Sequence, residues 1–166
     1  MTKTAETKVA LVTPDATPDG QDRAGGFGVR SAVSAVAGAF GQGRVVLDES
    51  LRLGRELTKI AVGRSEVAPH GGDRRFTDQA WTSNPLYHRV QQTYLASVDA
   101  IDGVVEEWGR RVDQRRAQEA AFVSAVLTSA LAPTNYLPTN PAAVKEAFDT
   151  GGMSLVRGAR NYVSDL

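Results

Sequence analysis

Ser154 and the two histidines are the residues whose chemistry could support acyl or proton transfer. Ser154 lies in residues 152–156 (GMSLV), which match a G-x-S-x-G nucleophile elbow except at the fifth position. That motif also needs a strand before the serine, and no strand pattern precedes residue 152. We therefore interpret Ser154 as a helix N-cap. His70 and His88 have no carboxylate or hydroxyl spaced to form a proton relay, so both are predicted to be solvated surface residues.

The sequence predicts no catalytic residue, no cofactor and no metal site. Residues 25–28 (GGFG) are rich in glycine, but they lack the Lys and Ser/Thr of a P-loop, and their partial G-x-G-x-x-G pattern follows no strand. Cysteine is absent, which leaves the two histidines as the only soft ligands or neutral-pH bases. Thiolate nucleophiles, thiolate metal sites and disulfides are excluded for this chain, and zinc chemistry of the usual kind is not expected.

Composition excludes several classes of function. The 166 residues balance 19 Lys+Arg against 19 Asp+Glu, whereas nucleic-acid-binding domains carry a basic excess. The length fits one domain of ordinary size. The N-terminus shows no signal-peptide pattern, and no apolar run is long enough to span a bilayer, so no transmembrane segment and a cytoplasmic location are expected.

Helical periodicity dominates the chain, and no run shows convincing alternation of apolar and polar residues, so we predict an all-α fold, a small irregular helical bundle. Residues 1–26 contain only one apolar island, residues 9–12 (VALV), and are predicted to be a disordered tail. A linker is expected at 64–72. The predicted helices cover residues 27–40 (weakly), 45–62, 85–111, 113–131, 141–149 and 154–166.

Several surfaces have two readings. Trp81, Tyr87, Tyr94 and Trp108 are expected to pack the bundle core, although a stripe of that length could instead bury a partner surface. The charged run 106–119 is interpreted as a solvated helix surface, and the apolar segment 27–40 could adsorb to a hydrophobic surface or partner.

The last helix keeps its apolar stripe to the end of the chain without a cap, which is typical of a chain cut at a domain boundary.

Six motifs in order make the second half similar to a known family. They are residues 73–87 (DRRFTDQAWTSNPLY), 92–95 (QTYL), 130–135 (ALAPTN), 139–145 (TNPAAVK), 148–152 (FDTGG) and 154–155 (SL). This series resembles the N-terminal domain of bacterial polyhydroxyalkanoate synthases. The resemblance is strong over 71–166 and weak over 45–62, in a layout reminiscent of the medium-chain-length class. It divides the chain into the tail at 1–26, a weakly structured helical segment and linker at 27–70, and the family-like domain at 71–166.

The resemblance implies a full enzyme that polymerises (R)-3-hydroxyacyl groups from coenzyme A thioesters into storage polyester and releases coenzyme A. In that family the chemistry belongs to a downstream α/β-hydrolase domain with a cysteine in a G-x-C-x-G box. This sequence contains no cysteine, so the catalytic domain is expected to be absent and the chain inactive alone. The implied roles are dimerisation, folding of the catalytic domain and association with polymer granules or granule-associated proteins in the cytoplasm. The implied partners are that catalytic domain, in cis or in trans, and a second copy.

The motif residues are expected to stabilise the fold or to form an interface. Arg74 or Arg75 should pair with helix carboxylates or C-terminal carbonyls, Trp81 should anchor the long helix, and Asn140 should cap the helix that follows it. The full set of structural or interface candidates is Arg74, Arg75, Phe76, Trp81, Tyr87, Tyr94, Trp108 and Asn140. The alternative hypothesis is a freestanding helical protein that binds granules or a partner without any catalytic domain.

Overall fold

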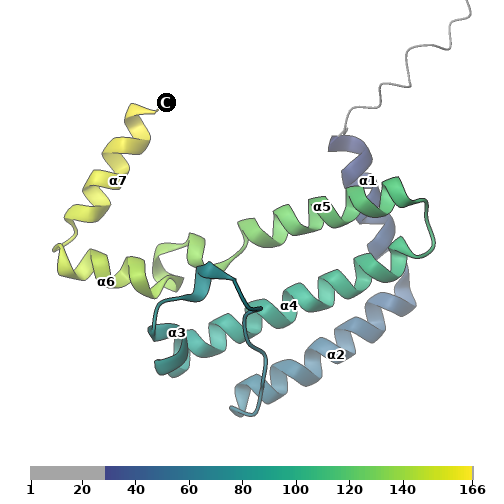
Figure 1. Cartoon of the computed structure of the whole chain (residues 1–166), viewed down its shortest axis with the longest axis horizontal. Helices are drawn as coiled ribbons and strands as arrows, with labels where there is room; N and C mark the ends of the chain where they lie inside the picture. Colours follow the sequence, from purple (N-terminus) through teal and green to yellow (C-terminus); the bar gives the residue numbers. More distant parts are fainter. Residues whose placement is uncertain (1–28, 166) are drawn as a thin grey trace, which may run out of the picture.

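The computed structural model describes residues 29–165, and this range contains helices and turns but no β-strand (Figure 1). The predicted all-α fold is confirmed. The α-helices are α1 (Val29–Phe40), α2 (Gly43–Ala61), α3 (Ala80–Ser83), α4 (Pro85–Gly109), α5 (Gln114–Ala130), α6 (Pro141–Asp149) and α7 (Met153–Ser164). Three 3₁₀-helices are η1 (Arg74–Phe76), η2 (Pro133–Asn135) and η3 (Leu137–Thr139). The tail predicted at 1–26 and the first two residues of the predicted helix 27–40 lie outside the described residues.

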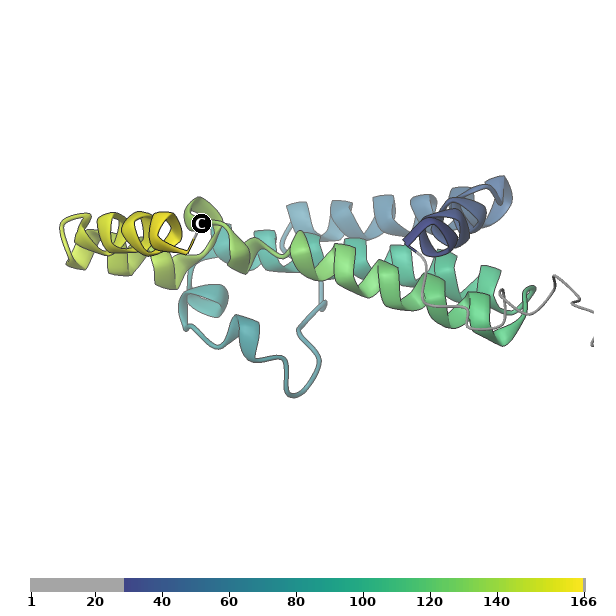
Figure 2. The same cartoon turned by 90° about the horizontal axis from the view of Figure 1, so that it is seen from above.

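The long helix α4 is the axis of the bundle. Helices α2 and α5 pack along it on opposite sides, and α1 crosses both α4 and α5 (Figure 1). Seen from above, α6 and α7 continue beyond the end of the bundle, and the segment that carries η1 and α3 projects to one side (Figure 2). The molecule is therefore an elongated bundle with a two-helix arm, α6 and α7.

One hydrophobic core lies where α1 crosses α4 and α5, and we call it the α1 core. Its buried residues are Ala35, Ala39, Val104, Val105, Trp108 and Ala120. Half of these are alanines, and a Cβ on Gly38 would lie 3.4 Å from the indole of Trp108, so small residues on α1 let the helices approach closely. Gly38, which weakens an isolated helix, is thus part of the packing surface of α1.

A second core gathers the aromatic residues of the first family-like motif, and we call it the aromatic core. It contains Phe76, Trp81 and Leu95, with the partly buried Tyr87 and Tyr94 packed against it. The stripe predicted as one core is therefore divided, because Trp108 belongs to the α1 core at the other end of α4.

The structure corrects the interpretation of Ser154. Helix α7 begins at Met153, and its N-cap is Gly152, which has a left-handed φ of 86°. Ser154 lies inside the first turn, where its backbone N–H donates to Thr150 Oγ1 at 3.1 Å. A turn through two consecutive positive-φ glycines, Gly151 and Gly152, moves the helix start one residue upstream of the serine.

We expect Ala39→Leu to destabilise the fold by about 1–3 kcal/mol, because Ala39 is fully buried in the α1 core and extra carbons there force helices apart. Ala37→Leu on the exposed side of α1 is the matched control and should change stability by less than about 0.5 kcal/mol. The measurement is the free energy of unfolding in urea. Equal effects of the two substitutions would show that α1 is not packed as described.

Candidate interaction surface

A chain of hydrogen bonds joins three distant segments at the inner end of the arm, and we call this region the junction. The Arg75 guanidinium donates to the Asp73 carboxylate, with Nη2–Oδ2 at 2.8 Å, and also to the Tyr94 hydroxyl at 3.0 Å. The Tyr94 hydroxyl in turn donates to the backbone carbonyl of Thr128 near the end of α5 at 3.0 Å. The loop before α3, the middle of α4 and the end of α5 are thus bonded in series.

The charge of Arg75 strengthens this series. Its guanidinium lies 5.6 Å from the ring centroids of both Phe76 and Tyr94, within the range of cation–π attraction. The hydrogen bond from Arg75 holds the pKa of Asp73 below its usual value, and the same contact raises the pKa of Arg75. Both groups are therefore charged near neutral pH, and their bonds are of the stronger, charge-assisted kind.

The aromatic core packs against the junction, because Phe76 and Tyr94 contact each other there. Trp81 is 1% exposed and makes edge-to-face contacts with Phe76, with centroids 5.0 Å apart, and with Tyr87 at 5.7 Å. His88, predicted to be a solvated surface residue, is only half-exposed, and its Nδ1 lies 3.0 Å from the backbone carbonyl of Trp81. The short helix α3 is in this way held against the first turns of α4.

Side chains complete the C-terminal end of α5, where a helix leaves its last carbonyls without backbone partners. Asn135 Nδ2 donates to the carbonyls of Ser129 and Ala130 at 2.8 and 3.1 Å, and the Tyr136 hydroxyl donates to Ala130 at 3.1 Å. Together with Tyr94 on Thr128, these bonds give each of the three carbonyls a side-chain donor.

The same loop fixes where α6 begins. Asn140 Nδ2 donates to the carbonyl of Thr134 at 2.7 Å, while its Oδ1 accepts from the N–H groups of Ala142 and Ala143 at 3.1 and 3.2 Å. Thr139 Oγ1 donates to the carbonyl of Pro133 at 2.7 Å. The path from α5 to α6 is therefore cross-linked by hydrogen bonds, which sets the direction in which the arm leaves the bundle.

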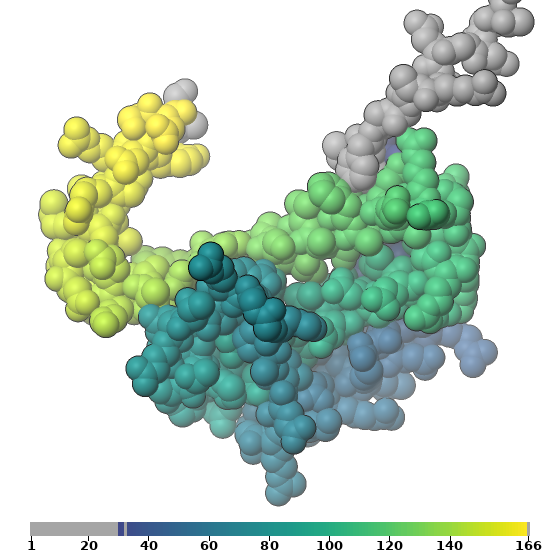
Figure 3. All heavy atoms as spheres, viewed as in Figure 1, coloured from purple at the N-terminus to yellow at the C-terminus, as the bar shows by residue number. Residues whose placement is uncertain are grey.

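The arm itself exposes apolar side chains. Phe148 on α6 is 82% exposed, Tyr162 on α7 is 68% exposed, and no residue of α7 is buried. Figure 3 shows the arm standing away from the bundle with open space between them. Helix α7 is amphipathic, because one side carries an apolar stripe and Arg157 and Arg160 lie outside it. The stripe consists of Leu155, Val156, Ala159, Tyr162 and Val163.

An almost wholly apolar cleft of about 460 Å³ lies inside the arm, between η3, α6 and α7. It is lined by Leu137, Pro138, Val144, Ala147, Phe148, Gly151, Gly152 and Leu155. A hydrophobic surface of this kind, projecting from a small domain, is typical of a protein–protein contact.

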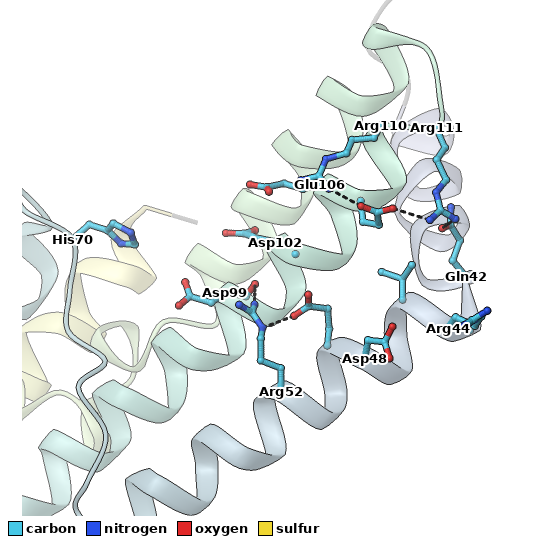
Figure 4. Close-up of a pocket in the computed structure, with 15 residues that line it drawn as sticks. Gln42, Arg44, Asp48, Arg52, His70, Asp99, Asp102, Glu106, Arg110 and Arg111 are labelled. Carbon is cyan, nitrogen blue, oxygen red and sulfur yellow. Dashed lines mark hydrogen bonds and ion pairs between the residues drawn. The ribbon is translucent and has the colours of Figure 1, made fainter.

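The larger cavity, of about 1130 Å³, is a polar groove between α2 and α4 (Figure 4). Half of its charged groups pair with one another: Arg52 pairs with Glu49 at 2.7 Å, and Arg110 and Arg111 pair with Glu107 at 2.6 and 2.7 Å. Among residues 29–165 no cluster of three or more His, Cys, Asp or Glu side chains is arranged to hold a metal ion. We interpret this groove as the solvated seam between two helices.

Comparison with known proteins assigns the chain to a family. The model of the poly-beta-hydroxybutyrate polymerase (PhaC) N-terminus matches residues 72–166, which is more than half of the chain. The chain belongs to this family. The matched residues of the PhaC N-terminus contain the whole junction and the whole described arm, and Asp73 is the second matched residue.

The chain is also similar to curated poly(3-hydroxyalkanoate) polymerases. Poly(3-hydroxyalkanoate) polymerase 1 of Ectopseudomonas oleovorans is 44% identical over 115 residues, which are 68% of this chain and 20% of that protein. Polymerase 2 of the same organism is 40% identical over 116 residues, which are 70% of this chain and 20% of that protein. The polymerase subunit PhaC of Rhizobium etli is 33% identical over 94 residues, covering 57% and 15% of the two chains. The chain thus spans about a fifth of the length of such polymerases, and no solved structure matches it.

The structure brings most of the candidate residues of this PhaC N-terminus together. Arg75, Phe76, Trp81, Tyr87 and Tyr94 meet in the junction and the aromatic core beneath it. Arg75 pairs with Asp73 in the preceding turn, where a helix carboxylate or carbonyl was expected, and Arg74 is exposed in η1. Asn140 lies at the N-cap of α6, and Trp108 lies in the α1 core.

Sequence reasoning missed the residues that complete the end of α5. Asn135 and Tyr136 act on carbonyls five or six residues earlier in the chain. The available signal was the pair of prolines with an asparagine directly after a helix, a composition in which side chains often take over the helix's orphan carbonyls. The apolar stripe of the last helix was predicted to be unfinished, but none of its residues was among the interface candidates.

We expect Tyr94→Phe to lower the free energy of unfolding by about 1–2 kcal/mol, because it removes both the acceptor of Arg75 and the donor to Thr128. Tyr162→Phe is the matched control, since that side chain is 68% exposed on α7, and it should leave stability unchanged. Urea unfolding of the two variants measures the difference. A Tyr94→Phe chain as stable as the parent would show that the junction contributes nothing to folding.

Asp102 in the polar groove gives a prediction in which the substitution raises, rather than lowers, the free energy of unfolding. Partial burial, together with Asp99 and Glu106, raises its pKa, so the folded chain holds the Asp102 proton more tightly than the unfolded chain does. The ionised carboxylate therefore destabilises the fold above its raised pKa. Asp102→Asn should raise the free energy of unfolding at pH 7, and this gain should vanish below the ordinary aspartate pKa of about 3.9. A loss of stability at pH 7 would contradict the assignment.

Proposed function

We propose that this chain is the non-catalytic N-terminal domain of a polyhydroxyalkanoate polymerase and that its α6–α7 arm docks onto the rest of that enzyme. The observation that carries the proposal is the exposed apolar surface of the arm in a chain that spans about a fifth of its polymerase relatives. An apolar stripe on a helix without a buried residue is stabilised only when another surface covers it.

The junction supports this role because it holds the arm in one direction. Bonds from Tyr94, Asn135 and Asn140 link α4, the end of α5 and the start of α6, so α6 leaves the bundle in a defined direction. A preorganised surface loses less conformational entropy on binding than a flexible one. The arm is thus suited to a permanent contact with the α/β-hydrolase domain that the family resemblance implies.

The remaining roles follow from the same assignment. The full enzyme would polymerise (R)-3-hydroxyacyl groups from coenzyme A thioesters. This chain has no cysteine, so the nucleophile that the resemblance implies would belong to the catalytic domain. Through its apolar surfaces this domain would support folding of the catalytic domain, dimerisation and association with cytoplasmic polyester granules. Within residues 29–165 no helix is both long and apolar enough to cross a membrane.

The test is binding in trans. The chain is co-expressed with the remaining four fifths of the Ectopseudomonas oleovorans polymerase 1, and co-elution and coenzyme A release are measured. We expect the parent chain to bind and the double variant Phe148→Ser, Tyr162→Ser to bind at least about tenfold more weakly, because buried aromatic anchors dominate interfaces.

The matched control is the double variant Leu47→Ser, Leu51→Ser, which removes two exposed apolar side chains from α2. It should bind like the parent. Equal binding by the arm variant and the parent would contradict docking through the arm. Binding of the chain to isolated granules, with no binding to the catalytic remainder, would support a freestanding granule protein instead.

A further inference from the structure

Helix α2 lies at one edge of the bundle and carries apolar and small residues on its solvent side, a stripe that we call the α2 face (Figure 1). Its members recur at steps of four, three and four residues, the spacing of a helix that packs along a second helix. They are Leu47, Leu51, Gly54 and Thr58. All of them are exposed, Leu47 by 58% and Leu51 by 52%. The opposite side of α2, which includes the buried Ile60, packs onto α4.

Gly54 is the member of the α2 face that the packing of its own domain does not explain. A Cβ on Gly54 would meet no described atom within 4 Å, so packing within residues 29–165 does not require a glycine there. A glycine inside a helix costs about 1 kcal/mol relative to alanine. What a glycine provides is close approach of another group to the helix backbone. The α2 face therefore has the form of a surface against which a second helix can pack.

Two charged side chains of opposite sign flank the α2 face on one side. Asp48 directly follows Leu47, and Arg55 directly follows Gly54, so the two charges lie seven residues apart on the same side of α2. Both are exposed, and neither forms an ion pair within residues 29–165. Charges at such flanking positions determine which partner a packed helix accepts and in which direction.

We propose that a second copy of this chain packs on the α2 face, with the two α2 helices antiparallel. A two-fold axis that passes between residues 52 and 53 places Leu51 opposite the partner's Gly54 and Leu47 opposite the partner's Thr58. The same axis brings Asp48 level with the partner's Arg55 to within about 3 Å along the helix, at about 1.5 Å per residue. Large side chains thus meet small ones and opposite charges meet, twice each. A contact between identical surfaces requires this self-complementarity.

The arrangement of sizes excludes the parallel alternative. Two parallel α2 helices would place Leu51 against Leu51 and Gly54 against Gly54, so a gap would follow a crowded layer. The antiparallel contact is small, because two helices that meet over four turns bury less than the roughly 1,200 Å² at which specific interfaces begin. We therefore expect a dissociation constant on the order of 100 μM for the isolated chain. The inference rests on the dimerisation included in the proposed function, for which it names the surface and the direction.

The experiment is sedimentation equilibrium of the whole 166-residue chain at low salt and at concentrations up to about 1 mM. The parent chain should show a monomer–dimer equilibrium. Asp48→Arg and Arg55→Asp should each weaken association at least about tenfold, because each one replaces two attractive pairs by two repulsive pairs. The chain that carries both substitutions should associate like the parent, since the pairs are restored with their signs exchanged. Leu47→Ser with Leu51→Ser should abolish the dimer.

Two variants serve as controls. Arg89→Asp reverses an exposed charge on α4 outside the α2 face and should leave the dissociation constant unchanged. The arm variant Phe148→Ser, Tyr162→Ser should also associate like the parent, because the arm and the α2 face share no residue. Circular dichroism of every variant confirms that the helices are retained.

Three results would overturn the proposal. They are a parent chain that stays monomeric up to about 1 mM, a dimer that neither charge reversal weakens, and a double charge reversal that associates as weakly as the single ones. None of these bears on docking of the arm to the polymerase, which is measured with the arm variant. A dimer that only the arm variant disrupts would place the second copy on the arm.

Discussion

The Tyr94 hydroxyl is the contact on which the rest of the domain depends. It accepts from Arg75 and donates to the carbonyl of Thr128, so one side chain joins a loop, the central helix and the end of α5. Arg75 is in turn held by Asp73, and the rings beneath it exclude water from one side. Without this series the loop 73–81 and the end of α5 would meet only through apolar packing, which does not specify direction.

Direction matters because the arm has little packing of its own. Helix α7 buries no residue, and it follows α6 through two glycines with positive φ. The position of the arm is set at its base, where Asn135, Thr139 and Asn140 bond the loop after α5. The motifs shared with the PhaC N-terminus therefore form a hydrogen-bonded base and a projecting apolar surface.

Local sequence signals were sufficient for the helices. The helical periodicity around α4 and α5, and Asn140 directly before Pro141, depend on neighbours within a few residues, so they predicted the elements to within about two residues. Ser154 was misplaced because two glycines, read as a helix stop, also supply the next helix start. Partners distant in sequence were beyond such reasoning: Arg75 donates to the Tyr94 hydroxyl, and α1 packs through alanines whose role depends on Trp108. The exposure of the arm is likewise a tertiary property, since an apolar stripe alone does not show whether another part of the chain covers it.

The most direct test of the account is amide hydrogen exchange of α7 in this chain and in an intact polymerase that contains it. If the arm docks onto the rest of the enzyme, the amides of Met153–Ser164 should exchange rapidly in the isolated chain and be strongly protected in the polymerase, while α4 stays protected in both. Equally rapid exchange of α7 in both proteins would contradict docking through the arm.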